Sequence, residues 1–184
     1  DHPVTIQRKA HTVKRNGKTV KIKEYKQLWS LDLKWQLFFY IALFTGARRG
    51  EIVSLLWSDI DFAKSTIHFS KSTAVVKGEI IHTRQCAVPD IVIATAKKLM
   101  KEQKQICLQL GDYWKGSRDK QFQDNFVFIR DDGAQMHVDS PRTEFKRVIR
   151  IYNTNIAKDE SEMIPDNLTL HDLRHPYVKP TTKK

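Results

Sequence analysis

The alternation of apolar and polar residues along the chain predicts a mostly α-helical fold with one small antiparallel β-sheet. Residues 31–44 include the apolar run from Leu37 to Phe44 and predict a first long helix, which Gly46 would end. Residues 91–110 and 140–152 carry apolar residues at spacings of three and four, so each predicts a helix with one face toward a core. Most of the expected core therefore lies on helices.

Other signals predict where further helices begin. Residues 49–57 predict a second, shorter helix after the apolar run. Ser140 precedes Pro141, which is typical of an N-cap followed by the first helical residue. Thr169 lies three residues before Asp172, as in a capping box, and predicts that a last helix begins at Thr169.

Residues 66–89 show the period-two alternation that is typical of strands. Ile67 and Phe69 alternate with polar neighbours, and Lys77-Gly78 predicts a hairpin turn. The expected sheet therefore follows the second helix.

The composition favours a soluble, intracellular protein that binds nucleic acid. The chain has 184 residues, 40% of them hydrophobic, which suits one domain with a substantial core. Its formal net charge is +11, and such an excess is typical of proteins that bind a polyanion. No apolar run approaches the roughly 18 residues that span a bilayer, and no signal-peptide pattern opens the chain. Cys86 and Cys107 lie in apolar segments and predict reduced core cysteines.

The first 30 residues predict a basic arm with little to bury. We expect residues 1–30 to be an arm or interdomain linker and residues 31–184 to be one domain. Asn16-Gly17 indicates a turn within the arm. The arm is a solvated linker, a strip that contacts a nucleic-acid backbone, or the joint to a further N-terminal domain. Its basic residues are Arg8, Lys9, Lys14, Arg15, Lys18, Lys21, Lys23 and Lys26.

Residues 45–51 read Thr-Gly-Ala-Arg-Arg-Gly-Glu and join the first two predicted helices. Because packed helices would flank it, Arg48 is predicted to lie at a rigid junction. Its guanidinium is a planar fork of donors that suits two oxygens of one phosphate or carboxylate. The simpler interpretation is a solvated charge at a helix start.

Residues 171–175 read His-Asp-Leu-Arg-His, well over a hundred residues after the first motif. A Thr-Gly-x-Arg-x-Gly-Glu segment after an apolar helix, followed much later by His-x-x-Arg-His, resembles the catalytic domain of the tyrosine recombinases, the integrase family of phages and transposons. The segment from Leu55 to Asp61 adds to this resemblance, which runs from about Leu33 to His175. The resemblance implies the DNA breaking-rejoining fold and makes residues 31–184 the catalytic domain.

By this resemblance, two arginines from distant motifs hold one DNA phosphate. Arg48 and Arg174 would bind its non-bridging oxygens and stabilise the charge that builds up in the transition state. His171 would donate a hydrogen bond to the same phosphate or move a proton. His175 would support the site, with a core histidine as the alternative, and Glu51 would orient the Arg48 guanidinium.

The resemblance also implies a lysine on the hairpin that acts as general acid for the leaving 5′ oxygen. Lys77, at the predicted turn, fits this role best and Lys71 fits second, while a solvated lysine is the alternative for either. Lys71 and Arg84 are further expected DNA contacts beside the two arginines. Near residues 82–86 the chain lacks the second lysine-rich turn that many relatives carry.

The family cleaves DNA with a tyrosine a few dozen residues beyond the His-x-x-Arg-His motif. Tyr177 is the one tyrosine after Arg174, but it lies three residues on and beside Pro176, which disfavours a continuing helix. We therefore assign no nucleophile, and we expect the chain as written not to form the covalent link.

The resemblance implies site-specific DNA recombination or integration through a 3′-phosphotyrosine intermediate, without a cofactor. His171 and His175 are spaced as in helical zinc sites, but Asp172 stands where that pattern needs Glu, so no metal site is predicted. The expected partners are a double-stranded DNA attachment or recombination site, other protomers on that DNA and accessory DNA-bending proteins, with no membrane. The expected location is the bacterial cytoplasm or host nucleoid. The alternative function is a non-catalytic DNA-binding module.

Overall fold

The computed structural model of the chain describes residues 4–15, 18–72, 83–118 and 122–173. Contacts divide the chain into two compact units. Unit 1 comprises residues 1–31 and 145–168, and unit 2 comprises residues 32–144 and 169–184. Across the described ranges, no helix is both long and apolar enough to cross a membrane.

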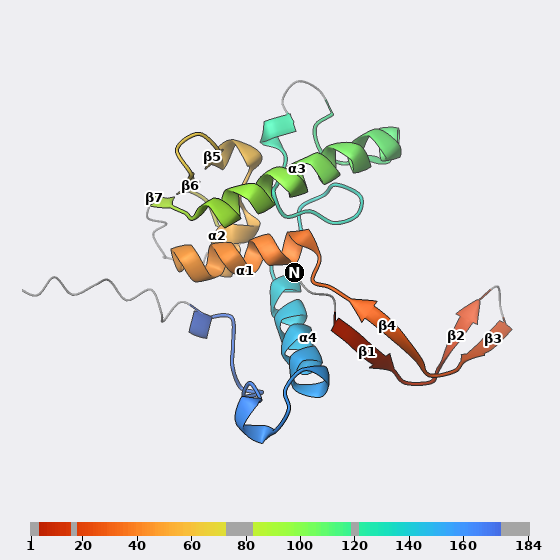
Figure 1. Cartoon of the computed structure of the whole chain (residues 1–184). Helices are drawn as coiled ribbons and strands as arrows, with labels where there is room; N and C mark the ends of the chain where they lie inside the picture. The colour runs from red at the N-terminus through yellow and green to blue at the C-terminus, as the bar shows by residue number, and fades with distance from the viewer. Residues whose placement is uncertain (1–3, 16–17, 73–82, 119–121, 174–184) are drawn as a thin grey trace, which may run out of the picture. The chain divides into compact units, whose positions relative to one another are not determined.

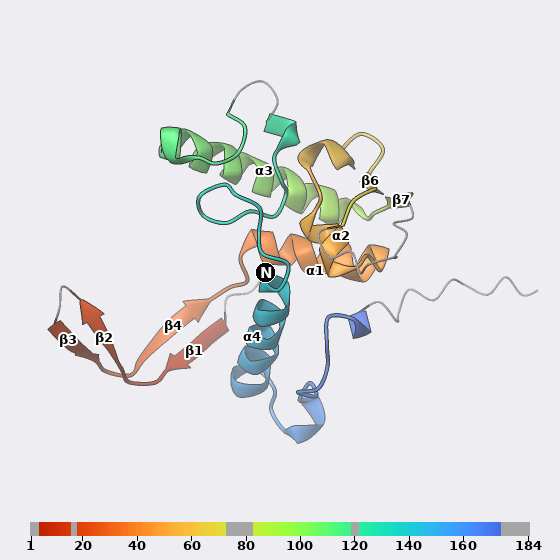
Figure 2. The same ribbon diagram turned by 180° about the vertical axis from the view of Figure 1, so that it is seen from behind.

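Unit 1 begins with a two-stranded antiparallel ribbon, which Figures 1 and 2 show from opposite sides. β1 (Val4–Arg8) pairs with β4 (Tyr25–Trp29), and β2 (His11–Arg15) pairs with β3 (Lys18–Ile22). From the sequence we expected a basic arm here and assigned no strands to it. The ribbon forms because β-branched residues are frequent on β1, β2 and β3, and β4 carries Tyr25 and Trp29, which are also residue types that favour strands. The many lysines between them mask this signal.

The β1–β4 end of the ribbon and helix α4 (Ser140–Asn155) contribute side chains to the apolar core of unit 1. The Gln7 N–H donates to Asn155 Oδ1 at 3.4 Å. The Arg147 guanidinium lies 5.9 Å from the centroid of the Trp29 ring. The buried apolar side chains of this unit are Ile6, Phe145, Ile149 and Ile151.

The chain after α4 returns along the same helix. Asn153 Nδ2 donates to Ile164 O at 2.8 Å, and the Ile164 N–H donates to Asn153 Oδ1 at 2.9 Å. Lys146 Nζ donates to the carbonyl oxygens of Asp166 and Leu168. One amide and one ammonium side chain therefore fix a connector that has few buried residues of its own.

Unit 2 is built from helices and a three-stranded antiparallel sheet with strand order β5-β6-β7. Its helices are α1 (Leu33–Thr45), α2 (Arg49–Val53) and α3 (Asp90–Leu110). Its strands are β5 (Ile60–Asp61), β6 (Thr66–Phe69) and β7 (Arg84–Ala87). The short 3-10 helices of the chain are η1 (Trp57–Asp59), η2 (Gly111–Tyr113), η3 (Phe122–Asp124) and, in unit 1, η4 (Glu160–Glu162).

The core of unit 2 lies between α1 and α3, which run side by side. α1 buries Leu37, Phe38 and Ile41. The Phe38 ring meets Phe128 edge-on, with 5.4 Å between ring centroids. Apolar faces at helical spacing therefore meet as the sequence predicted, and the mostly helical fold with a small antiparallel sheet is confirmed.

Two predicted details differ from the structure, and a third is not tested by it. The second helix ends at Val53 rather than at residue 57, because the Ser54 N–H closes onto Glu51 O and the chain then extends. Helix α4 begins at Ser140 with Asp139 O accepting from the Thr143 N–H, so Asp139 rather than Ser140 is the N-cap. The predicted turn at Lys77-Gly78 lies outside the described residues.

Both cysteines are free thiols, as predicted. Cys107 is buried on α3, and burial raises the pKa of its thiol. Cys86 is only half-buried on β7, so it is not a core residue. β7 is an edge strand of its sheet, which explains this exposure.

Candidate functional site

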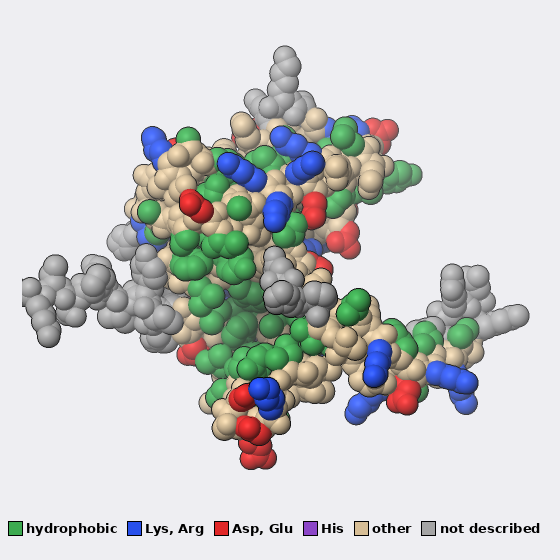
Figure 3. All heavy atoms as spheres, in the orientation of Figure 1, with side chains coloured by type: hydrophobic (Ala, Val, Ile, Leu, Met, Phe, Trp, Pro, Cys, Tyr) green, Lys and Arg blue, Asp and Glu red, His purple; other side chains and the backbone are tan. Residues whose placement is uncertain are grey.

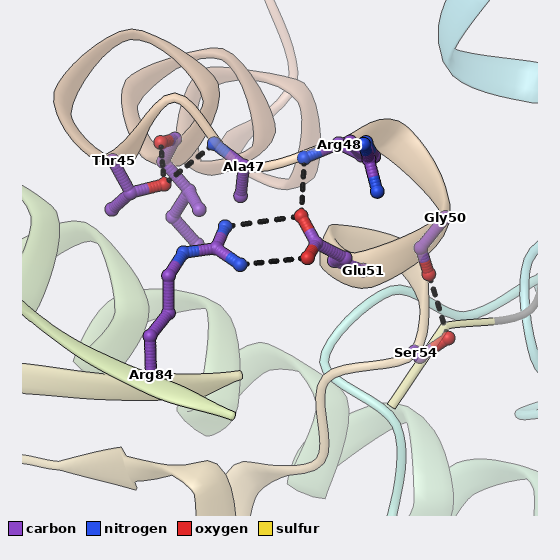
Figure 4. A network of polar contacts seen from close by, with 8 residues as sticks. Thr45, Ala47, Arg48, Gly50, Glu51, Ser54 and Arg84 are labelled. Atoms are coloured by element: carbon purple, nitrogen blue, oxygen red, sulfur yellow. Dashed lines mark hydrogen bonds and ion pairs between the residues drawn. The ribbon is translucent and has the colours of Figure 1, made fainter. Parts of the chain in front are cut away.

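The turn between α1 and α2 is held by hydrogen bonds that it makes to itself (Figure 4). Gly46 ends α1 in the left-handed conformation with φ 59°, and its N–H donates to Ala42 O at 3.1 Å. The Thr45 hydroxyl donates to Ile41 O at 2.6 Å and accepts from the Ala47 N–H at 3.2 Å. The backbone that enters Arg48 is therefore fixed.

Arg48 is the N-cap of α2 and has an extended backbone conformation. Its N–H donates to Glu51 Oε2 at 2.6 Å, and its carbonyl oxygen accepts from the Ile52 N–H at 3.0 Å. Its side chain is exposed. The structure thus presents a guanidinium at the surface from a backbone that is bonded on both sides of its Cα atom.

The Glu51 carboxylate accepts the hydrogen bonds that hold this arrangement together. Its side chain is 8% exposed, and its carboxylate accepts from Arg84 Nη1 at 2.7 Å and Arg84 Nη2 at 3.0 Å. In Figure 4, Arg48 and Arg84 approach this carboxylate from different sides. The described hydrogen bonds show Glu51 holding the Arg48 backbone, while its predicted effect on the Arg48 guanidinium stays a prediction.

Two opposing effects set the pKa of the Glu51 carboxyl. Burial would raise this pKa because it disfavours the charged form. The hydrogen bonds from Arg84 and from the Arg48 N–H, together with the two arginine charges, favour the carboxylate and outweigh burial. The pKa of Glu51 is therefore lowered, and the residue is ionised near neutral pH.

Arg84 lies on β7 directly opposite Phe69 of β6. Its guanidinium carbon is 4.6 Å from the centroid of the Phe69 ring, a cation–π distance. The sequence analysis assigned Arg84 to DNA contact. In the structure its partner is Glu51, with 33% of the side chain exposed, so its described contacts are structural.

The segment that follows α2 is anchored by hydrogen bonds to residues 125–127 and to α3. The Val127 N–H donates to Leu55 O at 2.8 Å, and the Trp57 N–H donates to Asn125 O at 3.0 Å. Gln103 of α3 accepts from Trp57 Nε1 at 2.9 Å and donates to Val127 O at 2.7 Å. Trp57 and Gln103 are each 1% exposed. These bonds fix the backbone that directly follows the helix bearing Glu51.

The other predicted site residues fall in two groups. His171 is exposed in a turn where Asp172 Oδ2 accepts from the Thr169 N–H and hydroxyl, each at 2.7 Å, so the predicted capping contact is present. Lys71 is exposed two residues after β6. Four residues lie outside the described ranges: Lys77, Arg174, His175 and Tyr177. The convergence of Arg48 and Arg174 therefore stays a prediction.

A basic surface on α3 was missed by the sequence analysis. Exposed lysines occupy one side of this helix, and Figure 3 shows basic side chains gathered over it. Their spacing of three and four residues was the available signal, which the search for apolar periodicity passed over. They are Lys97, Lys98, Lys101 and Lys104.

The sequence matches the Phage integrase family over residues 16–178. The chain is 30% identical over 166 residues to the ICEBs1 integrase of Bacillus subtilis (strain 168). This match covers 85% of the chain and 40% of that integrase. The chain thus spans less than half the length of this relative.

Two solved structures have similar folds. The Tn1549 transposon integrase in complex with circular intermediate DNA has 26% identity and a TM-score of 0.57, over 77% of this chain and 43% of that one. The XerA recombinase has 16% identity and a TM-score of 0.53, over 79% of this chain and 41% of that one. With these folds and the family match over most of its length, the chain belongs to the phage integrase family and has the fold of a tyrosine recombinase catalytic domain.

Proposed function

We propose that this chain is the DNA-cleaving part of a site-specific recombinase or integrase. Residues 31–184 would form the catalytic domain and residues 1–30 the arm. The reaction would cut one DNA strand through a 3′-phosphotyrosine intermediate and rejoin it to another strand.

The observation that carries this proposal is the position of Arg48. Its side chain is exposed, while its backbone is bonded through Glu51 and Ile52. A solvated arginine at a helix start does not need such support. A guanidinium that must meet a phosphate in one geometry does need it, because a preorganised donor stabilises developing charge without reorganising during the reaction.

The reaction needs fixed cations because negative charge builds up on the phosphate oxygens while an alkoxide leaves. Arg48, together with Arg174, would bind the two non-bridging oxygens as planar donors. Loss of one such donor typically costs about 2.7–4 kcal/mol of transition-state stabilisation. His171 would hydrogen-bond the same phosphate, and His175 would support the site.

The leaving 5′ oxygen needs a proton donor. We propose Lys77 for this role and Lys71 as the second candidate, because both belong to the segment that links β6 to β7. We assign no nucleophilic tyrosine within the chain. No cofactor is required by this chemistry, because the protein–DNA ester keeps the energy of the broken bond.

The proposed partners are double-stranded DNA, other protomers on paired sites and accessory DNA-bending proteins. The Tn1549 integrase is seen in complex with circular intermediate DNA, which supports DNA as the partner of this chain. The net charge of +11 supports the same conclusion. Binding to phosphates by exposed lysines and arginines would fall with salt, with a slope of about −0.9 per phosphate neutralised.

The test is formation of a covalent adduct. The chain, together with its native flanking sequence, is incubated with a nicked candidate site and then denatured. We expect a protein–DNA adduct that survives denaturant. Its absence with every flanking length would contradict the proposed reaction.

Arg48→Ala separates this proposal from a non-catalytic DNA-binding module. In a recombinase, this change lowers the cleavage rate by about 10²–10³-fold while DNA affinity falls only modestly. Arg49→Ala is the matched control, because Arg49 pairs with Asp139 on the neighbouring surface at 2.9 Å. Equal losses in binding and cleavage for Arg48→Ala would favour the binding module.

A further inference from the structure

Two contacts hold the Arg84 guanidinium: it lies over the Phe69 ring, and its two terminal nitrogens donate to the Glu51 carboxylate. The Phe69 ring lies 4.6 Å from the guanidinium carbon, and Phe69 is 1% exposed. Glu51 receives one N–H from each terminal nitrogen. A guanidinium that contacts both an aromatic ring and a buried carboxylate has little freedom to turn, so Arg84 has a defined position on the sheet.

Glu51 depends on this defined position of Arg84. A buried carboxylate without a partner is costly, and the cost is reduced only when hydrogen bonds and an opposite charge satisfy it. Arg84 supplies both, at 2.7 and 3.0 Å. The orientation of the Glu51 carboxylate is therefore set from β7.

Arg48 depends in turn on Glu51. The oxygen that accepts from Arg84 Nη2 also accepts from the Arg48 N–H, at 2.6 Å. A shift of this oxygen would move the backbone nitrogen of Arg48, the residue whose guanidinium is proposed to bind the phosphate. Displacements of about 1 Å in a catalytic arrangement can cost about 10²-fold in rate.

We propose that Arg84 is a positioning residue for Arg48, acting through the shared Glu51 oxygen, and that it influences DNA only through Arg48. This inference rests on the proposed role of Arg48 at the DNA phosphate. It replaces the earlier expectation that Arg84 contacts DNA directly. It also gives the pairing of β6 with β7 a role, because this pairing places Arg84 beside Glu51.

Charge adds a second consequence. Arg84 and Glu51 together are neutral, so the pair does not cancel the positive charge of Arg48. Removing Arg84 alone leaves an uncompensated carboxylate next to Arg48, which would draw the Arg48 guanidinium toward the protein. Removing both charges relieves this attraction. The double variant should therefore bind DNA better than the single variant.

The first experiment does not use DNA. Amide hydrogen exchange of the Arg48 N–H is measured by NMR in the chain and in Arg84→Met, with the amides of α3 as a reference for global stability. We expect exchange at Arg48 to accelerate by at least tenfold while the α3 amides change little. Unchanged exchange at Arg48 would overturn the proposal. Arg84→Lys keeps the charge but loses the fork, so it gives an intermediate acceleration if Arg84→Met does not fold.

The second experiment is a double-mutant cycle on duplex DNA affinity. The variants are Arg84→Met, Arg48→Ala, both together, and Arg84→Met with Glu51→Gln. We expect Arg84→Met to weaken binding several-fold, to have no further effect on the Arg48→Ala background, and to be partly rescued by Glu51→Gln. Gln85→Met, on the same strand with an exposed side chain, is the matched control and should leave affinity unchanged.

The two experiments separate the possible failures. Equal losses from Arg84→Met with and without Arg48 would mean that Arg84 contacts DNA itself, which overturns the inference. If Arg48→Ala leaves the DNA cleavage rate of the chain with its native flanking sequence unchanged, the proposed role of Arg48 fails. The exchange rate of the Arg48 amide then still decides whether Arg84 positions that residue.

Discussion

The turn that carries Arg48 and the outer β2–β3 end of the ribbon both present basic side chains, but they are held in different ways. The turn combines buried side chains with side-chain hydrogen bonds at Thr45, Arg48 and Glu51. The outer ribbon relies on strand pairing, and its described side chains are mostly exposed, including Val20 at 44%. A two-stranded ribbon without a packed face is marginally stable alone.

This difference indicates two modes of contact with a polyanion. Catalysis requires one guanidinium in one place, so several independent contacts determine the backbone of Arg48. Neutralisation of a phosphate backbone requires charge near a surface but no single geometry, so the lysines of the ribbon can stay mobile at their tips. Substitutions at the turn should therefore alter stability or chemistry, whereas substitutions on the ribbon should alter only salt dependence.

The largest stability effect is expected from Gln103→Leu on α3. This change leaves the Trp57 indole N–H and the Val127 carbonyl oxygen buried without their partners. Each unsatisfied group costs about 1–3 kcal/mol, so the free energy of unfolding should fall by about 2–6 kcal/mol. Urea denaturation measures it. Gln105→Leu, on the exposed side of α3, is the control, and a loss as large there would remove the special role of Gln103.

Glu51→Gln should lower the free energy of unfolding by about 1–2 kcal/mol at pH 7, a value reduced because Arg84 is partly exposed. The pKa of Glu51 is lowered on folding. Its contribution is therefore present above the unfolded-state pKa of about 4.3 and is lost as pH falls through the lower folded-state pKa.

The measurement is urea denaturation of both proteins at pH 7 and near pH 3. The difference between wild type and Glu51→Gln should shrink at the lower pH. Glu102→Gln, an exposed site on α3, is the control and should show little difference at either pH. A difference for Glu51→Gln that stays constant with pH would show that packing, not charge, underlies the effect.

Gly46→Ala tests the backbone of the turn itself. Gly46 has φ 59°, and a residue with a Cβ atom in this region costs about 1–2 kcal/mol. Gly111→Ala at the end of α3 is the control at a second glycine with positive φ, because Gly111 has φ 51° and ψ −117°, outside the left-handed helical region, and open space around an added Cβ atom. Gly111→Ala should lose at least as much stability as Gly46→Ala by thermal denaturation, but only Gly46→Ala should change exchange at the Arg48 amide. Equal exchange in both would show that the turn does not control Arg48.

The smallest effect on stability is expected on the ribbon. Changing Lys21, Lys23 and Lys26 together to Gln should leave the free energy of unfolding within about 0.5 kcal/mol of the original. The salt dependence of DNA binding should become shallower, by up to about 0.9 per lysine that contacts a phosphate. The matched change to Arg keeps the charge and should preserve the slope. If the triple change to Gln leaves the slope of the salt dependence unchanged, the ribbon is a solvated linker and not a DNA contact.

The sequence predicts the helices of unit 2 well because their apolar residues recur at helical spacing. α1 and α3 begin and end within two residues of the predicted bounds, and glycines end both. The predicted end of α2 was wrong because a tertiary contact determines where this helix ends. The pairing of residues 55–57 with 125–127 draws the chain out of the helix, and local sequence does not encode a partner 70 residues away.

The candidate site was predictable in its motifs but not in its connections. Arg48 and Glu51 are recognisable from their spacing, since a carboxylate three residues after an N-cap bonds back to it. The contact between Glu51 and Arg84 links residues 33 positions apart and depends on how β6 pairs with β7. A charged residue on a strand looks the same in sequence whether it faces a ligand or a buried carboxylate.

The Thr45 hydroxyl, which both donates and accepts within the turn, makes this bend independent of water. A loop that relied on solvent to complete its hydrogen bonds would lose them when a large polyanion covered the surface and expelled that solvent. Here the protein itself completes them, so the described backbone bonds of the turn persist in a dehydrated interface. Exclusion of water would then strengthen the electrostatic attraction between Arg48 and a phosphate without weakening the hydrogen bonds that position Arg48.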